Sequence, residues 1–167
     1  MRTLIIAAAL AISASSLHAA PRGPTTPKPG SAERTAILDA LRVGITYPYI
    51  IKFRVDTLRM FRSKKGAIAY VIAEPSKQEF DAGTYFLTQS GTGPWKQVWA
   101  DTGGGSDSCA QGALHYSWAM RLIRYYGIAP DALVPGITAQ TQEFVAQAKS
   151  DPDLQCTGDL EGGPERL

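Results

Sequence analysis

The 167-residue sequence is poor in the residues from which most metal and nucleotide sites are built. It has two histidines, and one of them lies in the first twenty residues, so His115 is the only histidine of the remaining chain. A centre with several histidine ligands is therefore excluded, and no cysteine or carboxylate spacing matches a zinc pattern. The phosphate-binding lysine loop and the dinucleotide-binding glycine fingerprint are also missing. The sequence predicts no metal site and no cofactor.

Excess charge and long apolar runs are also scarce. The formal net charge is +2 at pH 7, which provides no general attraction for nucleic acids or membranes. The uninterrupted apolar run from Leu4 to Ile12 is too short for a membrane span, which needs about 20 apolar residues. We therefore expect no membrane span and no nucleic-acid partner.

Residues 1–19 have the pattern of a secretory signal peptide. Arg2 supplies the positive charge, the apolar run follows it, and small residues precede a cleavage site after Ala19. No cysteine lies near this site, so a lipid anchor is not expected. Residues 20–30, which are rich in proline, then form a linker. The protein is expected to be periplasmic or secreted.

The hydrophobic pattern of residues 31–150 predicts one compact α+β domain. Ser31 can cap a first helix, which a helical apolar period extends to about residue 43. Period-two alternation then predicts four strands, and their short connections imply an antiparallel sheet, which two further helices follow. The strands are expected within 51–60, 67–73, 85–87 and 95–100, and the later helices within 114–125 and 138–149.

Two details of the predicted sheet depend on strand periodicity. The apolar positions change parity between Val55 and Leu58, which predicts a β-bulge near Asp56-Thr57. Trp95 and Trp99 are expected to share one strand face. The helices are expected to cover one face of the sheet. Such a shape is similar to cystatin-like and NTF2-like domains, by an analogy that carries no function.

The most distinctive stretch, from Glu33 to Arg42, reads ERTAILDALR. With looser matches as far as Leu133, this ER-x-AILDALR start resembles a group of small uncharacterised exported bacterial proteins. The chain departs from that group around Ser108 to His115, where it carries extra residues. The resemblance covers about residues 31–134 and implies export and an α+β domain. It supplies no catalytic residues.

The two cysteines can be interpreted in two ways. In an oxidising compartment, Cys109 and Cys156 are expected to form a disulfide, which would tether the tail over residues 151–167. A free Cys109 near a helix start would instead have a lowered thiol pKa. With Asp107 and His115 it could then form a thiol hydrolase.

Asp101-Thr102-Gly103 is the triplet that aspartic proteases use, in which two aspartates share a proton and activate a water. Only one copy is present, so a dimer would have to supply the second aspartate, and the following chain predicts a helix instead of the required strand. Residues 101–107 also lack the ligand alternation of a calcium loop. No packing argument from the sequence explains the three glycines that follow Thr102.

Two surfaces remain as candidates for binding. Arg54, Arg59 and Lys64 belong to a basic first hairpin, which could contact anionic polymers or could simply be a solvated, charge-protected edge. Trp95 and Trp99 would either belong to the core or line a pocket. We therefore expect a binding or accessory module for an unknown periplasmic protein or envelope component. A hydrolase centred on Asp101, or on a free Cys109 with His115, is the alternative.

Export predicts a processed N-terminus. We expect N-terminal sequencing of the secreted or periplasmic protein to begin at Ala20, because Leu17 and Ala19 occupy the positions that signal peptidase recognises. An intact Met1 in that fraction would contradict the signal-peptide prediction.

Overall fold

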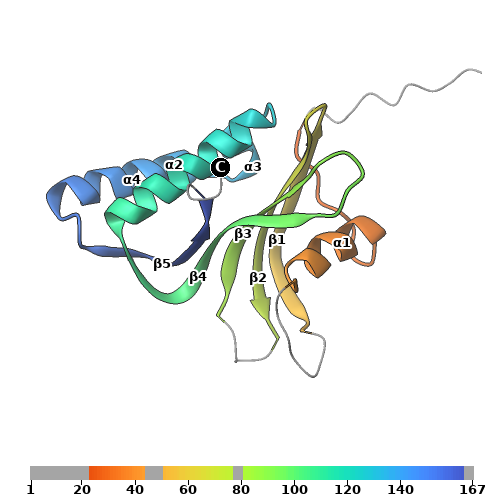
Figure 1. Cartoon of the computed structure of the whole chain (residues 1–167), viewed down its shortest axis with the longest axis horizontal. Coiled ribbons are helices and arrows are strands. Elements are labelled where there is room, and N and C mark those ends of the chain that lie inside the picture. The colour runs from red at the N-terminus through yellow and green to blue at the C-terminus, as the bar shows by residue number, and fades with distance from the viewer. Residues whose placement is uncertain (1–22, 44–50, 77–80, 164–167) are drawn as a thin grey trace, which may run out of the picture.

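A computed structural model of the chain describes residues 23–43, 51–76 and 81–163. The predicted signal peptide lies outside the described residues. A five-stranded antiparallel sheet has helices on both of its faces (Figure 1), and its strands follow the order of the chain. The elements are α1 (Ala32–Ala40), β1 (Phe53–Ser63), β2 (Gly66–Pro75), β3 (Gly83–Gln89), β4 (Lys96–Ser108), α2 (Cys109–Tyr125), α3 (Pro130–Leu133), α4 (Ile137–Ser150) and β5 (Gln155–Gly162).

The α+β class is confirmed, but the predicted four-stranded sheet is wrong because the tail provides a fifth strand. β5 pairs antiparallel with β4, from Trp99 opposite Gly162 to Ser108 opposite Gln155. This edge strand is largely polar and partly exposed, so it has no apolar alternation that could be recognised in the sequence. The short helix α3 adds a third helical segment after β4, where two were predicted.

Two hydrophobic cores lie on opposite faces of the sheet, so the expectation that the helices cover one face is also wrong. β2 serves both cores, which explains why its sequence is apolar at nearly every position. Its small residues Ala67, Ala69 and Ala73, together with Val71, belong to the core beneath α1. Its larger residues Ile68 and Tyr70 belong to the core beneath α2 and α4.

Local signals position the two principal helices. Ser31 caps α1 by accepting a hydrogen bond from the Arg34 backbone N–H at 3.3 Å, and Ile37 of α1 is fully buried against the sheet. α2 begins with a capping box between Ser108 and Gln111. These caps satisfy backbone N–H groups that the first turn of a helix leaves without partners.

Bulges determine which side chains face which core. The predicted bulge is confirmed, because the register between β1 and β2 shifts between Val55 and Thr57. A second shift leaves Val98 unpaired between β3 and β4. This extra residue places Trp95 in the core beneath α1 and Trp99 in the core beneath α2. The two tryptophans therefore do not share a face, contrary to the expectation from simple alternation.

Thr25, within the predicted linker over residues 20–30, reaches the edge of the sheet. Thr25 and Met60 of β1 exchange two backbone hydrogen bonds, both of 2.8 Å. The bridge satisfies backbone groups on the outer side of β1, which would otherwise be an open sheet edge.

A disulfide joins Cys109, the first residue of α2, to Cys156 in β5. Their Cα atoms are 4.8 Å apart, and Cys109 is fully buried. The bond ties the edge strand to the helix layer, and a disulfide fits an oxidising environment.

Loss of this bond should destabilise the protein without changing its fold. Because the cysteines are 47 residues apart, the Cys109→Ala/Cys156→Ala double variant should unfold with about 4 kcal/mol less free energy in urea than the oxidised protein. The wild type in reducing buffer should behave like the variant. Free thiols in denatured, unreduced protein would contradict the bond.

Candidate functional site

The residues predicted as catalytic gather where β4, β5 and α2 meet. Asp101 accepts a hydrogen bond from the Tyr116 hydroxyl at 2.6 Å and another from the Gly158 backbone N–H at 3.0 Å. Burial and the adjacent Asp101 carboxylate raise the pKa of Tyr116. Both carboxylate oxygens of Asp101 are therefore engaged in joining three elements.

Asp107 has a related role on the same strand. Its carboxylate accepts a hydrogen bond from the Leu160 backbone N–H at 2.8 Å. Between Thr102 and Asp107 the regular pairing of β4 with β5 is interrupted. The two aspartates thus accept hydrogen bonds from β5 backbone N–H groups where the pairing of the strands is irregular. Backbone N–H groups that are shielded from water need such acceptors.

The glycines between these aspartates belong to β4, which continues past the strand predicted within 95–100 as far as Ser108. Gly104 has φ +87°, a left-handed conformation that favours glycine. A Cβ on Gly105 would overlap the backbone nitrogen of Asp159, and one on Gly158 would overlap the carbonyl oxygen of Thr102. Close approach of β4 and β5 therefore explains glycines that the sequence alone left unexplained.

His115 of α2 is buried against β4 and the end of β5. Its Nε2 lies 3.0 Å from the Ala100 carbonyl oxygen, and its ring stacks on Trp99 with centroids 4.7 Å apart. Burial lowers the pKa of His115 and outweighs the opposing effects of the Ala100 carbonyl, Asp101 and Asp107. The neutral imidazole then donates through Nε2 to that carbonyl.

The structure therefore brings the four candidate catalytic residues into one region but gives each a structural partner. The Cys109 sulfur is part of the disulfide, so it is not available as the thiolate that a cysteine hydrolase needs. In the described part of the chain, no group of three or more histidine, cysteine, aspartate or glutamate side chains could hold a metal ion.

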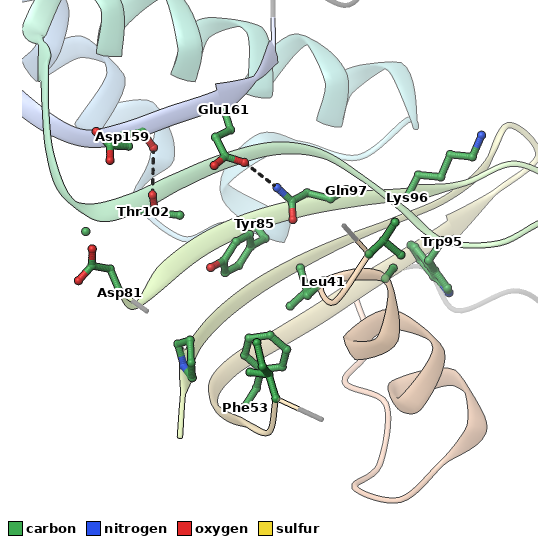
Figure 2. A pocket seen from close by; sticks show the side chains of 15 residues that line it. Leu41, Phe53, Asp81, Tyr85, Trp95, Lys96, Gln97, Thr102, Asp159 and Glu161 are labelled. Carbon is green, nitrogen blue, oxygen red and sulfur yellow. Dashed lines mark hydrogen bonds between the residues drawn. The ribbon is translucent and has the colours of Figure 1, made fainter. Parts of the chain in front are cut away.

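The opposite face of the sheet contains a cavity of about 740 Å³. α1 covers part of this face, and the cavity lies beside the C-terminal end of that helix (Figure 2). Its apolar wall comes from α1, from the start of β1 and from the neighbouring strand ends. The apolar lining residues include Leu41, Ile51, Phe53, Pro75 and Trp95.

The polar wall of the cavity is formed mainly by the last strands. Asp81 precedes β3, Thr102 and Gln97 belong to β4, and Asp159 and Glu161 belong to β5. The Gln97 amide lies 3.4 Å from the Glu161 carboxylate, as drawn in Figure 2.

Tyr85 lies between the two walls of the cavity. Its side chain folds over Gly83, where an added Cβ would stand within 2.8 Å of the ring. Burial raises the pKa of Tyr85, and the nearby Glu161 and Asp81 carboxylates raise it further. The phenol therefore lies in a region of negative electrostatic potential.

The residues predicted for binding are dispersed. Trp95 lines the cavity, although it is largely buried and donates from Nε1 to Glu33 at 3.0 Å. Trp99 is fully buried in the other core. Arg54 forms ion pairs with Glu74 and Asp56.

The other two residues of the predicted basic hairpin lie apart from the cavity lining. Lys64 is exposed in the turn between β1 and β2, and Arg59 is half-buried on β1.

Sequence reasoning missed most of the cavity. Asp159 and Glu161 lie in the segment that was taken for a tail, and their i, i+2 spacing was the only signal that both could face one side of a strand. Phe53 and Tyr85 were assigned to strands, but which face each one occupies depends on the bulges.

No protein-family model matches the chain, and neither curated proteins nor solved structures include a significant match. Among the described residues, no helix combines the length and apolar character needed to cross a membrane.

His115 should make stability depend on pH. Its pKa in the folded protein lies below that of an unfolded histidine, about 6.5. Protonation therefore favours unfolding, and stability should be lost as pH falls below about 6.5 towards the folded pKa, by at most about 1.4 kcal/mol per pH unit. His115→Gln should flatten urea-unfolding free energies between about pH 7 and pH 5. An equal slope in both proteins would contradict this assignment.

Proposed function

We propose that the protein is an exported binding module that holds a small amphiphilic ligand in the cavity beside α1. The observation that carries the proposal is the cavity itself, whose apolar wall faces a polar wall of carboxylates, an amide and a hydroxyl. Its volume of about 740 Å³ lies within the usual range for ligand pockets, about 300–1,000 Å³. The signal-peptide pattern and the disulfide support export.

The division of the fold into two faces also supports this function. The face beneath α2 and α4 is filled by large side chains, including Phe86, Trp99 and Phe144. Among the described residues, the other face is covered by a nine-residue helix, and apolar residues of the cavity lining lie beside its C-terminal end. A binding site on that face can exchange its ligand while the larger core stays packed.

The hydrolase alternatives have less support. One needs a free Cys109 thiol, and the other needs Asp101 to activate a water. The sulfur is in a disulfide and both carboxylate oxygens are hydrogen-bonded within the fold. These residues also lie on the opposite face of the sheet from the cavity.

Filling the cavity should abolish binding. We expect Nile red, an uncharged apolar dye, to bind the wild-type protein saturably with a blue shift of its emission, because apolar side chains line the cavity. In Gln97→Trp the indole should occupy this space and weaken dye binding by about tenfold or more.

Gln142→Trp is the matched control, because Gln142 is exposed on α4 and outside the cavity. This variant should bind the dye like the wild type. Circular dichroism melting curves check that both variants are folded. Absence of saturable binding to the wild type, or equal binding by the folded Gln97→Trp variant, would contradict the proposed site.

A further inference from the structure

We infer that the ligand of this cavity is an organic cation, a small molecule with a flat apolar body and a protonated amine. This inference rests on the proposed binding function and adds the chemical class of the ligand. Three properties of the cavity carry it: the sign of its charge, the spacing of its carboxylates and its aromatic lining.

The cavity is negatively charged although the chain as a whole is positively charged. Among the described residues, its lining contains the carboxylates of Asp81, Asp159 and Glu161 and one ammonium group, that of Lys96, which gives these lining residues a net charge of −2 against +2 for the whole sequence. None of the three carboxylates forms an ion pair with any described cation. Figure 2 shows the Lys96 side chain directed away from them.

The glycines of β4 make room for two of these carboxylates. A Cβ on Gly104 would stand 2.7 Å from the Asp81 carboxylate, and a Cβ on Gly105 would overlap the Asp159 carboxylate. These glycines therefore provide room for acidic side chains from two distant parts of the sequence.

The three carboxylates are too dispersed to act as one metal site, since no group of described acidic side chains could hold a metal ion. Charge spread along a wall suits a protonated amine, which is larger than a metal ion and can contact several carboxylates through its N–H groups. An organic ammonium ion is therefore favoured over an inorganic cation.

Aromatic rings provide the complementary surface. Tyr85 lies near Glu161 and Asp81, and Phe53 and Trp95 lie further along the lining. Ring faces attract cations and stack on flat apolar groups. An amine placed near Tyr85 would have carboxylates around it, while an attached ring would extend towards Phe53 and Leu41.

A pair of probes with the same ring and opposite charge tests the inference. Naphthylethylamine and naphthaleneacetate should be titrated into the wild-type protein by isothermal calorimetry at low and at high salt. We expect the amine to bind about tenfold more tightly or better than the acid, because a cation gains and an anion loses energy near the carboxylates. The difference should shrink with added salt.

Neutralising the acidic wall should remove this preference. In Asp159→Asn/Glu161→Gln, amine binding should weaken by about tenfold and acid binding should not weaken. Glu143→Gln/Asp153→Asn removes the same charge at exposed positions outside the cavity and should keep the preference. Asp81→Asn provides a second test outside β5, in case the double variant disturbs the edge strand.

The outcomes separate this inference from the proposed function. Equal binding of the two probes, tighter binding of the acid, or a preference that survives both carboxylate substitutions would overturn the cation assignment. So would failure of both probes. In each of these cases saturable Nile red binding that Gln97→Trp blocks would still support the cavity as a binding site. Loss of Nile red binding as well would overturn both the cation assignment and the proposed binding function.

Discussion

Pairing between β4 and β5 is the interaction on which both faces of the sheet depend. The two strands approach so closely that Gly105 and Gly158 leave no room for a Cβ. Where the ladder is irregular, Asp101 and Asp107 accept hydrogen bonds from β5 backbone N–H groups. The disulfide between Cys109 and Cys156 then holds the edge strand against the start of α2. An edge strand with little apolar surface of its own is thus secured by polar and covalent contacts.

The same pairing connects stability with the proposed binding site. On one side of the sheet, it places Asp101 and His115 within the packing of α2. On the other side, it places Asp159 and Glu161 on the wall of the cavity. Alternation of side chains along β5 allows one short strand to contribute to both faces. The residues that initially suggest a catalytic centre therefore hold β4, β5 and α2 together. The neighbouring acidic residues of β5 face the cavity.

The two faces differ in how completely they are covered. α2 and α4 bury a dense aromatic group that includes Trp99, Tyr116 and Phe144, with ring centroids 5.1–5.2 Å apart in successive pairs. α1 is short and meets mostly small residues of β2, such as Ala67 and Ala69. In the part of the chain that the structure describes, the short helix covers only part of this face, and the cavity lies beside its C-terminal end. The negative charge of its wall then restricts what the cavity can bind.

By itself, the sequence determined the features that depend on local patterns: the cap of α1 at Ser31, the positions of the first four strands, the bulge near Asp56 and the α+β class. The cysteine pair, together with the predicted export signal, was enough to predict the disulfide. The tertiary structure alone decided the fifth strand, because Gln155–Gly162 is held by pairing and has no hydrophobic period. It also decided the opposite placement of Trp95 and Trp99, because one unpaired residue, Val98, reverses the alternation. The cavity combines residues from Leu41 to Glu161, and such a site forms only when distant segments meet.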